Sequence, residues 1–236
     1  MKKFFLLLLM SAIFLAAGCG QTSKKAEPTP EQTSKATANH DGLYHFKITT
    51  KFGDMTGILY NETPIHRDNF IKLIGEEFYD GLLFHRVIQG FMIQGGDPES
   101  KGAASGVSLG NGGPGYTLKA EIKPERIHKK GALAAARTPD FMNPQRESSG
   151  SQFYIVQGKE VTQQELDNFV AQGKPFTETQ MAIYKKLGGT PMLDFEYTVF
   201  GEIIDGFDVL DAIAATPTQP GDRPIDNVVM KVELIK

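Results

Sequence analysis

Apolar and polar residues alternate along several short stretches of the chain, as expected for strands with one buried face. Residues 44–50 place Tyr44, Phe46 and Ile48 on one face, and residues 55–60 continue after a turn at Gly53. This pattern predicts a β-hairpin. Further strands are predicted from residue 82 onward and at residues 131–136, 151–156, 197–204 and 228–235.

Two stretches have helical spacing instead. Thr63 and Pro64 form a helix start, with Thr as the N-cap and Pro at the first helical position, and an apolar stripe follows until Gly75. A second helix is predicted at residues 207–215, before Thr216-Pro217. Many short strands framed by two helices predict an all-β barrel rather than alternating strands and helices.

Residues 158–190 do not fit a plain barrel. Thr162 with Glu165, and Thr177 with Gln180, form two capping boxes, each followed by an apolar stripe and then by glycine. We therefore predict a helical hairpin inserted between two strands, with its apolar faces against the barrel wall beside the pocket. Simple packing there is favoured over contact with a substrate.

The segment between Gly95 and Gly115 is rich in glycine. A phosphate-binding loop would need a Gly-Lys-Ser/Thr sequence followed by a helix, and neither occurs. A long irregular surface loop is the better interpretation.

The N-terminus has the pattern of a secretory signal over residues 1–18: two lysines precede an apolar run that is too short to span a bilayer. The small residues before Cys19 resemble the lipobox of bacterial lipoproteins, although Leu stands at position 15 rather than 16. This resemblance implies lipidation of Cys19 and an extracytoplasmic protein anchored to the bacterial cell membrane. An ordinary signal peptide that leaves a free thiol is the alternative. Cys19 is the only cysteine, which excludes an intrachain disulfide.

Residues 19–41 are polar and contain no large apolar side chain, so we expect a flexible linker. Residues 42–236 then form one domain of ordinary size. The formal net charge is −3 and no basic patch stands out, which argues against a nucleic-acid partner.

The most informative run is Phe84–Asp97, where the permanently charged Arg86 stands among apolar residues. Gly90 interrupts the alternation, and a glycine inside a strand pattern usually marks a bulge or bend. Such a bend would turn Arg86, Phe91, Met92 and Gln94 toward a common pocket.

This run resembles the signature of the cyclophilins, the peptidyl-prolyl cis-trans isomerases. Three later segments extend the resemblance over about residues 44–236: Gly131–Arg137, Gly150–Ile155 and the stretch from Leu193 to Gly201. The resemblance implies a closed antiparallel β-barrel of about eight strands and two helices. It also implies isomerisation of X-Pro bonds in proline-containing exported polypeptides, by a monomer that needs no cofactor and no metal.

By position, the resemblance makes Arg86 the catalytic donor, and Gln94 the residue that orients Arg86 and the substrate carbonyl. The implied substrate-binding residues are Phe91, Met92 and Leu193 around the proline, the backbone of Ala136 and Arg137, and the side chains of Phe153, Tyr154, Met192 and Tyr197.

The sequence departs from the commonest family pattern at the pocket rim. Tyr154 stands where Phe is usual, and its hydroxyl needs a partner or water. Met192 and Tyr197 stand where animal members usually carry Trp and His, and Arg137 where Asn is common. Cyclosporin binding is therefore expected to be possible but weakened, whereas isomerase activity is expected to be kept.

An arginine suits this reaction physically. Rotation about the X-Pro bond breaks amide resonance, at a barrier of ~18–20 kcal/mol, and returns a lone pair to the nitrogen. A fixed donor aimed at that nitrogen binds more strongly in the twisted transition state. Arg presents a rigid fork of donors and stays charged, so no titrating group is needed.

Other constellations are weak. The five histidines lack metal-ligand spacing, and we expect His85 to point away from the face of Arg86 and to make a structural hydrogen bond. No Gly-x-Ser-x-Gly motif accompanies the serines at 148–151, which argues against a hydrolase. A non-catalytic peptide-binding chaperone, or a surface interaction lipoprotein using the same groove, remains the alternative; the complete Arg86 set favours an isomerase.

Overall fold

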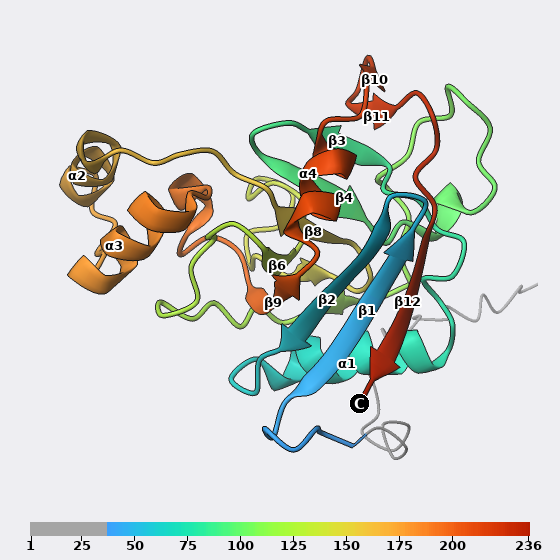
Figure 1. Ribbon diagram of the computed structural model, residues 1–236, viewed down its shortest axis with the longest axis horizontal. Coiled ribbons are helices and arrows are strands. Elements are labelled where there is room, and N and C mark those ends of the chain that lie inside the picture. Colours follow the sequence, from blue (N-terminus) through green and yellow to red (C-terminus); the bar gives the residue numbers. More distant parts are fainter. Residues whose placement is uncertain (1–36) are drawn as a thin grey trace, which may run out of the picture.

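The computed structural model describes residues 37–236 (Figure 1). The predicted signal peptide, Cys19 and most of the predicted linker lie outside these residues. Within them, no helix is both long and apolar enough to cross a bilayer.

Eight strands form one antiparallel sheet in the order β12-β1-β2-β9-β6-β8-β4-β3. Their bounds are β1 (Tyr44–Thr50), β2 (Gly53–Leu59), β3 (Arg86–Ile88), β4 (Met92–Gly95), β6 (Ala132–Ala135), β8 (Phe153–Val156), β9 (Val199–Asp205) and β12 (Met230–Ile235). Two small ladders pair β5 (Thr117–Leu118) with β7 (Ser148–Ser149), and β10 (Thr218–Gln219) with β11 (Arg223–Pro224).

The sheet curls until its two edges approach each other. Leu83, just before β3, forms an isolated antiparallel bridge with Val229, just before β12. In the described residues no longer ladder joins these edges, so what the structure shows is a curled eight-stranded half-barrel, a coarser form of the closed barrel that the sequence predicted.

Two helices frame this sheet as predicted: α1 (Pro64–Gly75) packs against β12 and β9, and α4 (Phe207–Ala214) against β2, β3 and β4. Figure 1 shows them at opposite ends of the curled sheet. The main core lies between them and is centred on Phe46, Phe70 and Phe153. Gly57 is needed there, because a Cβ at this position would come within 2.3 Å of the Phe46 ring.

The helices α2 (Gln163–Ala171) and α3 (Glu178–Leu187) are both present, each with its predicted capping box. In Figure 1 they project to one side of the sheet. Their apolar residues form a separate cluster with Ile127 and Phe195, centred on Leu166 and Tyr184. The expectation that they cover the barrel wall was therefore wrong: loops that flank the sheet cover them instead. Two short 3-10 helices, η2 (Pro98–Ser100) and η3 (Pro191–Leu193), complete the fold.

Candidate active site

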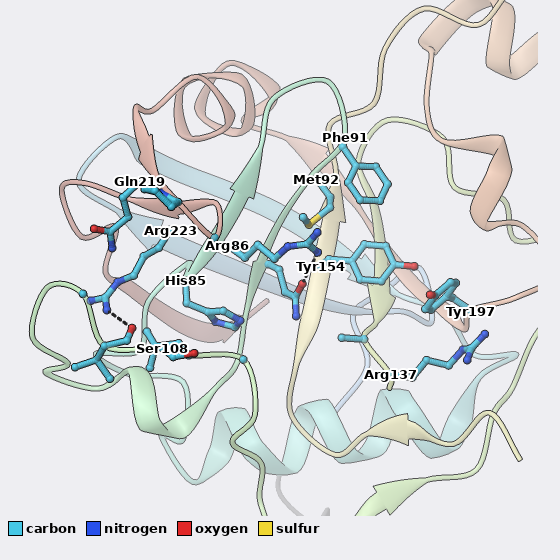
Figure 2. A pocket seen from close by; sticks show the side chains of 18 of the residues that line it. His85, Arg86, Phe91, Met92, Ser108, Arg137, Tyr154, Tyr197, Gln219 and Arg223 are labelled. Carbon is cyan, nitrogen blue, oxygen red and sulfur yellow. Dashed lines mark hydrogen bonds between the residues drawn. The ribbon is translucent and has the colours of Figure 1, made fainter. Parts of the chain in front are cut away.

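A pocket of about 540 Å³ lies on the outer face of the curled sheet, opposite the main core (Figure 2). Strand alternation produces this second face. Along β8, Ile155 joins the main core while Tyr154 faces outward, and along β4 Ile93 and Met92 divide in the same way.

Arg86 reaches the pocket because β3 and β4 form a tight hairpin. The predicted break at Gly90 is its turn, where Gly90 has φ 75° and the Phe91 N–H donates to the Ile88 carbonyl at 3.0 Å. This register places Arg86 directly opposite Gln94. The Arg86 Nη1 donates to Gln94 Oε1 at 3.3 Å, and its Nε to Asp222 Oδ2 at 3.4 Å.

A hydrogen bond to Gln152 fixes the side-chain amide of Gln94. Its Nε2 donates to Gln152 Oε1 at 3.0 Å. Gln152 is buried, and its Nε2 donates to the carbonyls of Gly110 and Gly112 at 2.9 and 2.8 Å. The amide of Gln94 thus has a fixed orientation, with its oxygen toward Arg86.

Beside Arg86 the wall is apolar and aromatic. Phe91 and Met92 come from the β3–β4 hairpin, and Leu193 comes from η3. The rings of Tyr154 and Tyr197 meet edge to face at 5.9 Å. A flat apolar ring such as that of proline fits such a surface, and burial there excludes water from the neighbouring donor.

The rim next to Tyr197 is formed by Ala136 and Arg137. The Ala136 N–H donates to the Gln152 carbonyl at 3.0 Å, and its carbonyl accepts from the Ser149 N–H at 2.7 Å. The Arg137 guanidinium is buried over the Tyr197 ring, 4.5 Å from its centroid, and forms an ion pair with Asp140. Both residues are therefore rigid parts of the rim.

Comparison with known proteins agrees with this geometry. The family model described as "Cyclophilin type peptidyl-prolyl cis-trans isomerase/CLD" matches residues 45–233. A putative peptidyl-prolyl cis-trans isomerase of Staphylococcus aureus (strain USA300) is 40% identical over 183 residues, covering 77% of this chain and 86% of the relative. One from Staphylococcus saprophyticus is 36% identical over 189 residues, covering 79% and 89%.

Among solved structures, the Cryptosporidium parvum cyclophilin type peptidyl-prolyl cis-trans isomerase superposes with a TM-score of 0.61 at 26% identity, over 82% of this chain and 98% of that one. A second structure of that protein, in the presence of the dipeptide Ala-Pro, gives a TM-score of 0.58 at 26% identity, over 81% and 99%. The chain belongs to the cyclophilin-type peptidyl-prolyl cis-trans isomerases.

Most residues that the sequence assigned to the cyclophilin site lie together in this pocket: Arg86, Phe91, Met92, Gln94, Ala136, Arg137, Tyr154, Leu193 and Tyr197. Two do not. Phe153 is 1% exposed and belongs to the main core, because it precedes Tyr154 on β8 and so faces the other way. Met192 is 51% exposed and is not among the residues that line the pocket.

The hydroxyl of Tyr154, which distinguishes this cyclophilin from the commonest pattern, has a protein partner. Its oxygen lies 3.0 Å from Nε2 of the buried His128. Burial raises the pKa of Tyr154 well above its usual range, so this hydroxyl keeps its proton.

His85 departs from our expectation. It lines the pocket next to Arg86, is 4% exposed, and neither ring nitrogen has a hydrogen-bond partner in the described structure. Burial, the largest effect, lowers its pKa from 6.5 to about 4. A neutral buried histidine is consistent with this site, where a second positive charge would oppose Arg86.

Sequence reasoning missed the remaining pocket residues: Gly106, Val107, Ser108, Leu109, Gly110, Gln219, Pro220, Gly221 and Arg223. Residues 106–110 come from the irregular glycine-rich loop, and residues 219–223 from the short β10–β11 hairpin, where no periodic pattern was long enough to place a side chain. The glycine-rich composition predicted the first loop, but not what it covers.

Proposed function

We propose that this isomerase accelerates the folding of exported proteins on the outer side of the bacterial cell membrane. X-Pro isomerisation takes tens to hundreds of seconds and limits the folding of many chains. A secretory signal with a lipobox-like Cys19 would hold such a catalyst where unfolded chains emerge.

The observation that carries the catalytic proposal is the position of Arg86 beside the apolar wall, with Gln94 as its rigid neighbour. The proline ring lies against Phe91, Met92 and Leu193. The guanidinium donates to the proline nitrogen only as the amide twists, so the interaction stabilises the transition state more than the ground state. No covalent bond breaks, hence no cofactor is required.

The substrate is a proline-containing polypeptide. The Cryptosporidium parvum cyclophilin studied in the presence of Ala-Pro supports this assignment. The backbone N–H and carbonyl of Ala136 already form hydrogen bonds with Gln152 and Ser149. We therefore assign the hydrogen bonds to the substrate residues before the proline chiefly to the backbone of Arg137.

Replacing Arg86 tests the mechanism. We expect Arg86→Ala to lower kcat/KM for an X-Pro peptide by about 10²–10³-fold, the loss typical of one transition-state donor. Arg67→Ala on α1, where Arg67 pairs with Asp68 and does not line the pocket, is the control and should retain activity. NMR exchange spectroscopy measures both. Unchanged exchange in Arg86→Ala would refute the mechanism, whereas a wild-type protein that binds the peptide without accelerating exchange would favour a peptide-binding chaperone.

The finer domain features are proposals of the same kind. We infer that residues 1–18 are the signal, that residues 19–41 are a linker lipidated at Cys19, and that residues 158–190 are a helical insertion in a monomeric domain. The Leu83–Val229 bridge supports closure of the barrel at its edges.

We also infer weak cyclosporin binding, because Met192 is exposed and, unlike Trp, offers no N–H donor.

Membrane anchoring has a direct test. In the bacterial host, Cys19→Ala should move the protein from the membrane fraction to the medium or periplasm. Retention in the membrane would refute lipidation at Cys19 without affecting the isomerase assignment.

A further inference from the structure

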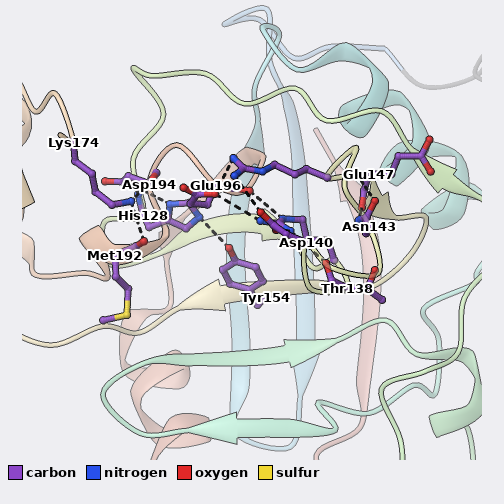
Figure 3. A network of polar contacts seen from close by, with 12 residues as sticks. His128, Thr138, Asp140, Asn143, Glu147, Tyr154, Lys174, Met192, Asp194 and Glu196 are labelled. Atoms are coloured by element: carbon purple, nitrogen blue, oxygen red, sulfur yellow. Dashed lines mark hydrogen bonds and ion pairs between the residues drawn. The ribbon is translucent and has the colours of Figure 1, made fainter. Parts of the chain in front are cut away.

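A chain of buried polar side chains joins α3 to the pocket wall. Figure 3 shows its part from Asp194 through His128 to Tyr154. The whole chain runs from Tyr184 on α3 through Asp194 and His128 to Tyr154 on β8. All four residues are at most 5% exposed. The Asp194–His128 and His128–Tyr154 links join segments that are distant in sequence, so the chain connects the α2–α3 pair to the pocket.

Asp194 is the centre of this chain. Its Oδ1 accepts from both the backbone N–H and Nδ1 of His128, each at 2.7 Å, and its Oδ2 accepts from the Tyr184 hydroxyl. A buried carboxylate requires such donors. Burial, and then the charge of Asp194, raises the pKa of Tyr184 well above its usual range, so its hydroxyl stays a donor.

The partners fix the direction of each bond. Because His128 Nδ1 faces a carboxylate oxygen, that nitrogen carries a proton. In the neutral form of the ring, Nε2 is an acceptor, and the Tyr154 hydroxyl at 3.0 Å donates to it. The two rings are also stacked, with an interplanar angle of 12° and centroids 6.0 Å apart. Tyr154 is thus held in one orientation.

A second contact reaches the same wall of the pocket at Leu193. Lys174, in the loop between α2 and α3, donates from Nζ to the carbonyls of Met192 and Asp194 at 3.0 and 2.6 Å. These carbonyls flank Leu193, which lines the pocket. The α2–α3 pair therefore holds both Tyr154 and Leu193.

We propose that the α2–α3 pair sets the shape of the proline pocket through the Tyr184–Asp194–His128–Tyr154 chain. Tyr184, Asp194 and His128 are then positioning residues, and the pair is more than a packed appendage. The inference rests on the proposed isomerase function. Because Tyr154 and Leu193 contact the proline in the ground state as well as in the transition state, a loosened pocket raises KM more than it lowers kcat.

Tyr184→Phe tests the proposal by removing one hydroxyl far along the chain from the substrate. We expect KM for an X-Pro peptide to rise about 3- to 10-fold, the equivalent of one net hydrogen bond, with kcat nearly unchanged. Tyr154→Phe should have a similar effect. The double variant should be no worse than Tyr154→Phe alone, because residues in one network are not additive.

Tyr79→Phe is the matched control: Tyr79 is buried in the main core, and its hydroxyl donates to the Ser151 carbonyl at 3.4 Å, outside the chain. It should lower the free energy of unfolding without changing KM. An unchanged KM in Tyr184→Phe, or effects of the two variants that add, would overturn the proposal.

Lys174→Met is the second variant, should Tyr184→Phe fail to fold. It removes the contacts to the Met192 and Asp194 carbonyls and the cation–π contact with Phe195. It should also raise KM; an unchanged KM would overturn the proposal that the α2–α3 pair shapes the pocket. If the wild-type protein does not turn over, the proposed function fails. In that case the Kd of an X-Pro peptide, measured for the wild type and the same variants, still tests whether the chain positions the pocket wall.

Discussion

Three arginines line the pocket, and their partners separate their roles. The side chain of Arg137 is only 5% exposed and engaged with Asp140, and buried Arg223 donates to several loop carbonyls. The side chain of Arg86 is 41% exposed, and its partner Asp222 is 45% exposed. An ion pair this exposed contributes at most about 1 kcal/mol. Arg86 can therefore release Asp222 and bind a substrate at a small cost in free energy. Arg137 and Arg223 would have to break the contacts of buried side chains to do the same.

At the same scale, His85 makes stability depend on pH. Its pKa is lowered by burial from 6.5 to about 4, so the folded protein takes up a proton less readily than the unfolded chain. The stabilising contribution of neutral His85 is fully present above pH 6.5 and is lost as the pH falls toward 4. We expect the protonation of His85 to lower the free energy of unfolding by about 2 kcal/mol at pH 5 relative to pH 7.5.

Urea unfolding at pH 7.5, 6 and 5 measures this loss. His85→Gln is the control, because an amide of similar size does not titrate in this range. The wild type should lose more stability than His85→Gln between pH 7.5 and pH 5. Equal losses would show that His85 is protonated as easily in the folded protein as in the unfolded chain.

The residues of the site were largely predictable, and the exceptions have a common cause. Motifs identified Arg86 and Gln94 because both lie in one short run of sequence. They could not tell which of the adjacent residues Phe153 and Tyr154 faces outward, since both faces of β8 are buried. The buried run lacks the polar alternation that would have indicated its register.

At the scale of elements, the sequence predicted helix starts whose capping partners are close in the chain, but not those whose partner is distant. The capping boxes at Thr162 and Thr177 were predicted and are confirmed, because donor and acceptor lie within four residues. The start of α1 was placed correctly, but Thr63 makes no capping bond. Glu121, far away in sequence, instead accepts from the N–H groups of Ile65 and His66 at 3.2 and 3.0 Å.

Glu121 therefore acts as the N-cap of α1. Burial would raise its pKa, but the hydrogen bonds from His66 and Ile65 outweigh it and the pKa is lowered, so the carboxylate stays charged at neutral pH. We expect Glu121→Gln to lower the free energy of unfolding by about 1 kcal/mol, the usual contribution of a charged cap. Glu125→Gln, exposed in the same loop, should change it little. Equal effects in urea unfolding would contradict the capping role.

At the scale of the whole molecule, the pocket depends on segments that meet only after folding. Its floor comes from the curled sheet, one side from η3, and its remaining edge from the loops around Val107 and Pro220. The sheet was predictable from strand alternation and the resemblance. The loop positions were not, because Arg223 fixes them through backbone carbonyls, which any sequence would supply; its side-chain partner, Asn227, is four residues away.

Arg223 joins the two loops across more than a hundred residues of chain. Its Nη1 donates to the carbonyls of Ala104 and Val107 at 3.0 and 2.9 Å, and its Nη2 to that of Ala103 at 3.2 Å. Because hydrogen bonds from a charged donor contribute about 1.5–3 kcal/mol each when buried, Arg223→Met should release the first loop. Hydrogen exchange at residues 103–110 should then accelerate, while exchange in β1 and β2 stays slow. Arg67→Met on α1 provides the control, and equal exchange in both variants would mean that the loop is held by its own turns rather than by Arg223.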